Sequence, residues 1–539
     1  MASNFLYLKL NWSADKSSVS ETDSSFRDGV MELRADRLKT FIFDQQIYCH
    51  DSNFLCALLG YLNNFEAVSS KWNINVKNDV ELILYLYEKL GTDFIKELDG
   101  VFLIVIYNLQ TSDLLAVQSR YGFSLPVYFH QDNYRFILST KKREILSDDF
   151  DNLKLDTIGA REFLFYEKVI PNKKTLITGI NKLLTNELLS IDYRKNKVSL
   201  TSNKPSLYKI NAKQAMQEIL SPIKNNVYSI QNSSLAKEIF LTLTAGWDTN
   251  LVLYYLNSIR NNENTLCAIN ASCGEAVSEL NQVEKILENY ESVNLLSECV
   301  PNSVVEDLPD MVSIYEGYLF ETAMFLRYHL ANALSEQKAN SIYTGACADQ
   351  IYSTPVLNWI IKYTKTLMEN KDAQLRLSLF HPQQKNEMNA TLDYLLKMHG
   401  IVFNAYGIQC LFPFITVHSE VMHNALGIKN FKKKIYKERI RELFGSKLVG
   451  NISKSGKVIE NNLYFDEYKS LLLRVLDKDI TLEIIGPKLR DKLNKSPEQY
   501  ASFIFQLVYI YTFNEIFVEN ISLNKKIENG QKIKLSEIL

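Results

Sequence analysis

The hydrophobic residues of the first 200 positions fall in short runs that are typical of β-strands. Val101–Tyr107 and Leu114–Gln118 are the clearest, because polar residues or glycine bound each apolar run. Similar runs occur at Leu6–Leu10, Thr40–Tyr48, Val127–His130, Phe136–Ser139 and Glu187–Ile191. This pattern predicts a layered domain built from antiparallel sheets.

After the polar segment Asn196–Asn211, which contains Pro205, strand-like and helix-like stretches alternate. Strands are predicted at Glu238–Leu243, Thr265–Ala271, Val293–Ser297 and Asn340–Tyr343. Helical periodicity covers Trp247–Ile259, Glu279–Tyr290 and Val304–Ser335. The alternation predicts a parallel sheet with helices on its faces, followed by a mainly helical region after residue 350. We therefore expect two domains, residues 1–205 and residues 206–539.

Composition and charge exclude several classes of function. The 539 residues include 60 Lys and Arg against 62 Asp and Glu, which gives a net charge of -2 and no bulk attraction for nucleic acid or an anionic membrane. The N-terminus lacks the pattern of a signal peptide, and Val101–Tyr107 and Phe503–Phe513 are too short to span a bilayer. We expect a cytoplasmic protein without nucleic-acid or membrane partners, in which Phe503–Phe513 is a core helix or, alternatively, lines a groove for a leader peptide or partner.

The seven cysteines include no C-x-x-C pair, so neither a zinc site nor a disulfide framework is indicated. His418 and His423 are spaced i,i+5 and would lie on different faces of a helix. No structural metal site is predicted.

The first segment with candidate chemistry runs from Leu241 to Asn250, where an apolar strand ends in a small, hydroxyl-bearing turn and a helix follows at once. Such a turn offers backbone N–H groups, the hydroxyls of Thr244 and Thr249, and a helix N-terminus to an anion. Asp248 fits an anion site only if it holds a Mg²⁺ shared with phosphates. The alternative is an ordinary helix N-terminus capped by Thr or Asp.

A second segment of the same kind begins about a hundred residues later. The strand Asn340–Tyr343 leads into Thr344-Gly345-Ala346-Cys347-Ala348-Asp349. If the two strands are parallel neighbours, Asp248 and Asp349 meet at the carboxyl edge of one sheet and suit a single Mg²⁺. In this segment Cys347 is interpreted as a small filler rather than a nucleophile. Trp247 could stack on adenine or pack beneath its loop.

With these segments in view, the chain resembles the asparagine synthetase family of ATP pyrophosphatases. Thr244–Thr249 is similar to that family's S-G-G-x-D-S loop, and Thr344–Tyr352 to its S-G-E-G-x-D-E-L-F segment. Weaker matches, in the same order as in the family, lie before these two segments at Leu98–Phe102, Arg120–Tyr128 and Thr175–Leu183, and after them at Phe412–Phe414 and Lys454–Gly456.

The resemblance implies an α/β fold in which an Ntn-hydrolase-like αββα sandwich precedes an adenine nucleotide α-hydrolase-like parallel sheet with helical additions. It also implies that the chain uses ATP and Mg²⁺, with Asp248 and Asp349 as the metal ligands and Lys454 as the catalytic residue. Lys457 would take this role if the turn is aligned differently with the family. The alternative for Lys454 is a solvated lysine in a basic loop. The implied nucleotide-binding residues are Thr244, Ala245, Gly246, Asp248, Thr249, Gly345 and Asp349.

The departures from the family pattern are equally informative. Ala2 stands where glutamine-hydrolysing members have their nucleophilic cysteine, and neither Cys49 nor Cys56 can supply the free α-amino group that the family mechanism uses as its base. Ala346 replaces a glutamate or tyrosine of relatives, Gln350 replaces an acid, and Ala245 replaces a glycine. We therefore expect retained adenylation, no glutaminase and no recognition of aspartate.

The resemblance to lasso peptide cyclases, which also vary at the position of Ala346, points to an amide-forming ligase that closes a peptide macrolactam and releases AMP and pyrophosphate. Its expected partners are a carboxylate substrate, such as a precursor peptide, and a leader-peptide-processing protein. The alternatives are glutamine-independent amidation of a small acid and a non-catalytic scaffold of the same fold.

Overall fold

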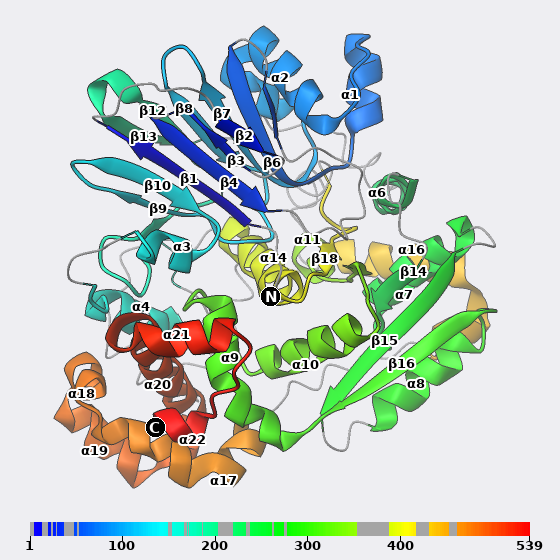
Figure 1. Cartoon of the computed structure of the whole chain (residues 1–539). Coiled ribbons are helices and arrows are strands. Elements are labelled where there is room, and N and C mark those ends of the chain that lie inside the picture. Colours follow the sequence, from blue (N-terminus) through cyan, green and yellow to red (C-terminus); the bar gives the residue numbers. More distant parts are fainter. Residues whose placement is uncertain are drawn as a thin grey trace.

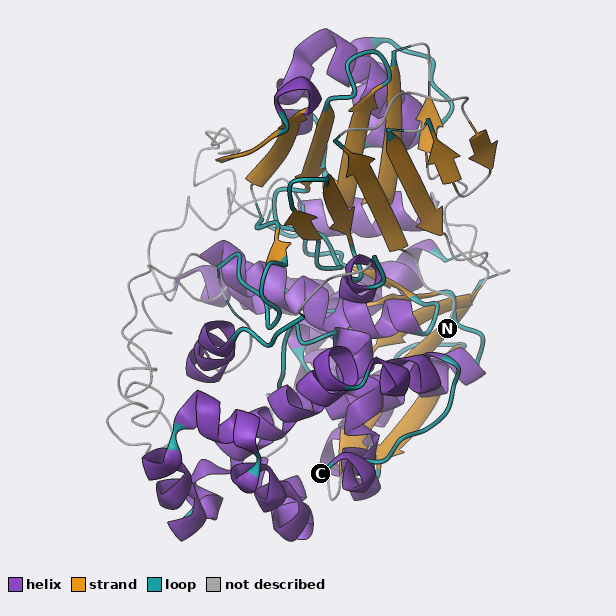
Figure 2. Ribbon diagram, turned by 60° about the vertical axis from the view of Figure 1, so that its left-hand side comes forward, coloured by secondary structure: helices purple, strands orange, loops and turns teal. Residues whose placement is uncertain are grey.

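In a computed structural model, the chain has a β-rich upper part with two sheets and a mainly helical lower part that surrounds a third sheet (Figures 1 and 2). The structure describes residues 5–539 except for 13–19, 23–24, 29, 37–47, 51–52, 149–152, 167–169, 171, 186, 203–218, 233–237, 261–263, 274–276, 353–387, 417–430 and 452–460. The expected α/β class is confirmed. The expected strand Thr40–Tyr48 and the expected domain boundary at residue 205 fall almost wholly outside the described residues.

The upper part consists of two antiparallel sheets that face each other. The seven-stranded sheet has the order β11 (Asn181–Lys182), β9 (Tyr128–Gln131), β10 (Arg135–Ser139), β1 (Phe5–Asn11), β4 (Met31–Asp36), β3 (Ser25–Arg27) and β2 (Ser20–Thr22). The six-stranded sheet has the order β13 (Lys197–Ser202), β12 (Glu187–Asp192), β8 (Leu114–Gln118), β7 (Gly100–Asn108), β6 (Phe54–Leu62) and β5 (Tyr48–His50).

β7 shows why this part of the sequence reads as continuous apolar runs. One set of its side chains, including Leu103 and Val105, packs toward the seven-stranded sheet, while Phe102 and Ile104 pack on the outer side against α1 (Phe65–Trp72) and α2 (Asp79–Leu90). Because both faces of the strand are buried, polar residues are unfavourable on either face and the strand is apolar throughout. The short 3₁₀ helix η1 (Gly91–Lys96) leads from α2 into β7.

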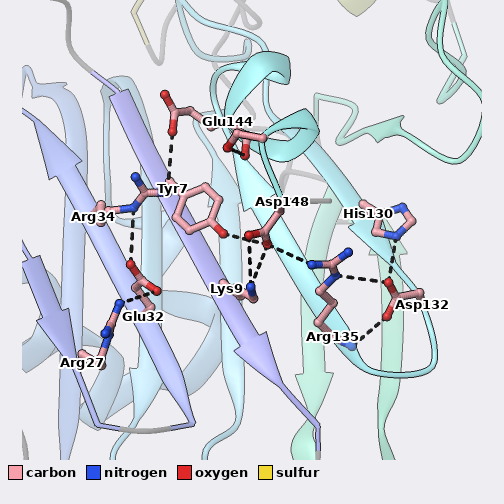
Figure 3. A network of polar contacts seen from close by, with 11 residues as sticks. Tyr7, Lys9, Arg27, Glu32, Arg34, His130, Asp132, Arg135, Glu144 and Asp148 are labelled. Atoms are coloured by element: carbon pink, nitrogen blue, oxygen red, sulfur yellow. Dashed lines mark hydrogen bonds and ion pairs between the residues drawn. The ribbon is translucent and has the colours of Figure 1, made fainter. Parts of the chain in front are cut away.

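The outer face of the seven-stranded sheet is polar instead (Figure 3). Asp148, which follows α3 (Lys142–Leu146), accepts a hydrogen bond from the Tyr7 hydroxyl at 3.1 Å and pairs with Lys9 at 2.9 Å and with Arg135 at 3.3 Å. On the same face Glu32 pairs with Arg27 and Arg34, and Arg135 also contacts Asp132. Strand alternation directs Leu6, Leu8 and Leu10 of β1 to the core and leaves this ladder of charges on the other side.

The lower part contains a five-stranded parallel sheet. Its spatial order is β16 (Val293–Val300), β15 (Thr265–Cys273), β14 (Glu238–Thr242), β17 (Ser341–Tyr343) and β18 (Gln409–Leu411). If the five strands are numbered by their order along the chain, their spatial order is 3-2-1-4-5. The chain therefore adds strands toward one edge of the sheet up to β16 and toward the other edge from β17 on, so the order reverses between the neighbours β14 and β17. β14 pairs with β17 through Leu241 and Tyr343. The sequence analysis did not predict β18, which has only three residues.

Helices lie on both faces of this sheet (Figure 1). α7 (Trp247–Ile259) and α8 (Val277–Leu287) connect the strands on one side, and α10 (Ala323–Glu336) lies on the other. The helical periodicity predicted over Val304–Ser335 does not form one continuous helix, because the segment is divided into η3 (Asn302–Asp307), α9 (Leu308–Tyr315) and α10. Glu316 and Gly317 break it with φ values of 49° and 67°. The apolar periodicity continues across the break because both helices bury a face.

The remaining helices complete the lower part. They are α4 (Thr157–Tyr166), α6 (Ser221–Asn232), α11 (Ala348–Tyr352), α14 (Met388–Ala405), α16 (Phe431–Asn451, with a kink at Gly445), α17 (Asn461–Leu472), η4 (Leu473–Asp477), α18 (Asp479–Ile485), α19 (Pro487–Lys495), η5 (Pro497–Tyr500), α20 (Ala501–Asn514), η6 (Glu515–Glu519), α21 (Ile521–Glu528) and α22 (Leu535–Ile538). In the upper part, the short 3₁₀ helix η2 (Tyr193–Lys195) joins β12 to β13. Among the described residues, one helical stretch, Pro497–Glu519, has the length and hydropathy of a membrane span, and 83% of its apolar window is buried within the protein. The expected core helix Phe503–Phe513 lies inside this stretch.

Buried contacts join the two parts of the chain. The Arg143 side chain pairs with Glu316 at 2.5 Å, and the turn at Ser124 packs directly on Gly400 of α14. The segment that follows β18 crosses the same boundary, since the Asn63 side chain donates a hydrogen bond to the Ile415 carbonyl at 3.3 Å and the Phe412 N–H donates one to the Tyr61 hydroxyl at 3.1 Å. The motif Phe412–Phe414 is therefore an internal packing segment, with both phenylalanines fully buried.

Candidate functional site

The loop between β14 and α7 is folded onto the first turn of the helix by its own side chains. The backbone N–H of Thr244 donates to the Thr249 hydroxyl at 3.2 Å, and that hydroxyl donates back to the Thr244 carbonyl at 3.2 Å. The Asn250 side chain donates to the carbonyls of Gly246 and Thr244 at 2.6 and 3.0 Å. The loop is thus ordered by polar contacts that leave the helix N-terminus at its tip.

The N-cap residue of α7 is Gly246, which makes no side-chain cap hydrogen bond. The alternative of a helix start with a Thr or Asp N-cap is therefore not what the structure shows. An uncapped first turn offers N–H groups and the positive end of the helix dipole to an anion. Asp248 lies in this first turn and is partly buried, so a cation is needed if an anion binds beside it.

The loop after β17 is built in a similar way. The Ala346 N–H donates to the Thr344 hydroxyl at 3.1 Å, and Cys347 has a φ of 75°. These turns lead into α11, where Asp349 is exposed in the first turn. Burial raises the pKa of the Cys347 thiol well above its ordinary value, which agrees with a filler and not with a nucleophile.

The two loops meet at the point where the sheet order reverses. A Cβ atom at Gly345 would lie 3.0 Å from the Thr249 nitrogen and 3.3 Å from the Asp248 carbonyl carbon. The turn of one loop is therefore in direct contact with the first helical turn of the other. In open α/β sheets, ligands bind at the carboxyl ends of the strands on both sides of such a reversal. The structure brings together Thr244, Ala245, Gly246, Asp248, Thr249, Gly345 and Asp349 at this edge.

The carboxylates of Asp248 and Asp349 suit Mg²⁺, but the protein alone does not supply enough ligands to surround a metal ion. Among the described residues, no group of three or more His, Cys, Asp or Glu side chains lies close enough to hold a metal ion. Mg²⁺ is commonly held by one or two carboxylates together with substrate phosphates and water. Asp248 and Asp349, in the first turns of helices that follow neighbouring strands, supply such an incomplete set.

Several predicted residues cannot be placed. Lys454 and Lys457 lie in 452–460 and Ala2 lies in 1–4, both outside the described residues, and the side chain of Cys49 is not described either. Cys56 is fully buried in β6. Trp247 is partly buried and lies beside two cations of α16, with the Arg441 guanidinium carbon 5.2 Å and the Lys437 Nζ 5.7 Å from its ring centre.

Two residues that the sequence analysis missed contact the first loop. Glu279 of α8 accepts a hydrogen bond from the Ala245 N–H at 3.4 Å, and Tyr436 of α16 donates one to Asp248 at 2.9 Å. Tyr436 is 188 residues from Asp248 in the sequence. No local pattern marks either residue, because each contact depends on how distant elements pack.

A cavity of about 290 Å³ lies elsewhere, between the sandwich, α9, α14 and α21. Its charged lining is already engaged in internal contacts. Arg143 pairs with Glu316 and Glu528, and Asp310 accepts a hydrogen bond from the Tyr328 hydroxyl at 3.1 Å. This cavity lies between the two parts of the chain, and its lining includes no residue of the loops after β14 and β17.

Comparisons with known proteins show partial similarities. Residues 40–202 match the family of glutamine amidotransferase domains. A glutamine-hydrolysing asparagine synthetase assigned in Methanocaldococcus jannaschii is 26% identical over 165 residues, which cover 29% of this chain and 31% of that one. Asparagine synthetases of Zea mays and Dictyostelium discoideum are 27% and 30% identical, over 20% and 18% of this chain and 18% and 19% of their own lengths.

The matched stretches thus span less than a third of each relative's length. Among solved structures, the allosteric regulatory enzyme of purine biosynthesis covers 55% of this chain and 75% of its own, at 10% identity and a TM-score of 0.24. The chain is similar, over part of its length, to asparagine synthetases, and its N-terminal sandwich contains a stretch that matches glutamine amidotransferase domains.

Proposed function

We propose that this protein is an ATP-dependent ligase that joins a carboxylate to an amine and releases AMP and pyrophosphate. The observation that carries the proposal is the contact between the two acidic loops at the reversal point of the parallel sheet. The partial similarity to asparagine synthetases supports the same class of reaction.

The proposed reaction has two steps. A carboxylate oxygen attacks the α-phosphorus of ATP, the bond to the oxygen that bridges the α- and β-phosphorus breaks, and pyrophosphate leaves. The amine nitrogen then attacks the acyl carbon, the bond between that carbon and the AMP oxygen breaks, and the nitrogen releases a proton as AMP departs. Negative charge develops on phosphate oxygens in the first step and on a tetrahedral oxygen in the second.

Each part of the site has a role in this reaction. The first turn of α7 and the hydroxyls of Thr244 and Thr249 would hold phosphate oxygens. Asp248 and Asp349 would hold Mg²⁺, which neutralises phosphate charge when bound. The Lys454 ammonium would stabilise the charge that develops in both transition states.

For the substrate we propose a peptide that is closed into a macrolactam, as the resemblance to lasso peptide cyclases suggests. Ala346 supports this choice, because its methyl group offers neither the negative charge of the glutamate nor the bulk of the tyrosine found in relatives that bind small substrates. We further propose that the enzyme acts in the cytoplasm on a precursor peptide, together with a leader-peptide-processing protein. Amidation of a small acid by ammonia is the second candidate.

The test is AMP formation by the full chain with ATP and Mg²⁺. One arm supplies synthetic peptides with a free N-terminal amine and one Asp or Glu side chain, and a second arm supplies aspartate with ammonium chloride. AMP together with a peptide that has lost one water is the expected result. AMP in the second arm alone would support the small-acid alternative, and tight ATP binding without AMP in either arm would indicate a scaffold and contradict the ligase proposal.

A further inference from the structure

The helix α16 packs beside both helices that begin at the candidate site. It contacts α7 and α11, and in Figure 1 it lies next to α7. The rings of Phe444 on α16 and Tyr254 on α7 are 5.4 Å apart. Tyr436 lies two turns earlier on α16, at the level of the first turn of α7, so the two helices run in the same direction along this contact.

The contact at the first turn is polar. The Tyr436 hydroxyl donates a hydrogen bond to Oδ1 of Asp248 at 2.9 Å, while only 2% of Tyr436 is exposed to solvent. A buried ring has few rotamers available, so the position of its hydroxyl is fixed. The hydrogen bond therefore limits the rotation of the Asp248 carboxylate.

Two cations hold the same end of α16 in place. Lys437 and Arg441 are four residues apart on one face of the helix and flank the ring of Trp247, the residue directly before Asp248. Cation–π contacts of this kind attach α16 to the loop. They also place positive charge next to the loop that is proposed to hold phosphate.

We infer that Tyr436 is a positioning residue that orients Asp248 to bind Mg²⁺ in the Mg²⁺–ATP complex. This inference rests on the proposed function. Ligating carboxylates in metal sites are themselves hydrogen-bonded, and loss of such a partner typically lowers metal affinity by 10–100-fold. Tyr436 acts through the carboxylate and is not itself a ligand.

The test is ATP binding measured by equilibrium dialysis as Mg²⁺ is increased, for the wild-type chain and for Tyr436→Phe. The substitution keeps the ring and removes only the hydroxyl. We expect the Mg²⁺ concentration for half-maximal ATP binding to rise about 10-fold or more. ATP binding in the presence of EDTA should stay the same.

The matched control is Tyr107→Phe, which removes another buried tyrosine hydroxyl that donates to a carboxylate, that of Asp28 in the sandwich, at 3.0 Å. It should leave the Mg²⁺ dependence unchanged. If Tyr436→Phe has the wild-type Mg²⁺ dependence, or if it weakens ATP binding equally with and without Mg²⁺, this inference is overturned and the proposed function stands. If the wild-type chain shows no Mg²⁺-dependent ATP binding, both are overturned.

Discussion

Gly345 is packed against Thr249, and this contact joins the two loops of the candidate site. A Cβ atom added to Gly345 would lie 2.8 Å from Cγ2 of Thr249 and 3.0 Å from its backbone nitrogen. Both distances are shorter than ordinary van der Waals contact, so a side chain at position 345 must push the loops apart. The spacing between Asp248 and Asp349 thus depends on a residue that carries no side chain.

Gly345→Ala should therefore weaken nucleotide binding. Overpacking of this size costs about 1–3 kcal/mol, and we expect Mg²⁺–ATP affinity to fall at least 10-fold. Thr249→Ser removes the methyl group that the new Cβ meets and retains the hydroxyl. Calorimetric titration of the double variant should recover part of the affinity, and no recovery at all would show that the methyl contact is not the cause.

Lys454→Ala should lower turnover by about 10²–10³, because its ammonium is expected to act on charge that is present mainly in the transition states. ATP affinity should stay within a few-fold of wild type. Pyrophosphate release is measured with whichever carboxylate substrate is active, and Lys457→Ala serves as the control. Loss of activity only in Lys457→Ala would assign the catalytic role to Lys457. Full activity in both variants would show that neither lysine stabilises the transition states.

The protein should not hydrolyse glutamine. The chain has Ala2 where a thiol nucleophile would be required, and Cys56 is fully buried in β6. The measurement is glutamate release from glutamine, with and without ATP, by the purified chain. Stoichiometric glutamate production would show that the sandwich holds a different nucleophile.

Stability should rise with pH above neutrality because of buried lysines. Burial lowers the pKa of Lys182 to about 7, an effect that Asp393 opposes and that Lys397 and Lys142 reinforce. The unfolded chain binds this proton up to a pKa of about 10.4, so between these values folding releases a proton and the free energy of unfolding increases with pH. Below about pH 7 the full cost of burying the charge applies.

Lys182→Met should reduce the slope of unfolding free energy against pH by up to about 1.4 kcal/mol per pH unit between pH 7 and 10. Denaturant titrations at several pH values give this slope. Lys174→Met is the control, since the Lys174 side chain is 40% exposed. An unchanged slope in Lys182→Met would mean that Lys182 stays protonated in the folded protein.

The sequence was most informative where chemistry and local structure coincide. The loop Thr244–Thr249 combines a strand end, small residues and a helix start within a few positions, so its turn could be recognised without tertiary information. The alternation of strands and helices predicted that β14 and β17 are parallel, but not that they are neighbours in the sheet. Their pairing brings the second loop to the first.

Features that depend on packing between distant segments could not be predicted. The contact between Tyr436 and Asp248 requires α16 to lie along α7, and nothing in either segment specifies that arrangement. The break at Glu316 and Gly317 is another example, because the apolar periodicity of α9 continues into α10. The Glu316 side chain is held by Arg143 from the other part of the chain, a partner that local sequence does not reveal.

The most direct test of the central claim is calorimetric titration of Mg²⁺–ATP into the wild-type chain, Asp248→Asn and Asp349→Asn. Each substitution keeps the size of the side chain and removes the negative charge that would hold Mg²⁺ between loop and phosphates. Asp466→Asn, at an exposed position on α17, is the control. The account predicts binding by the wild type and the control and no measurable binding by either site variant. Full-affinity Mg²⁺–ATP binding in both site variants would contradict it.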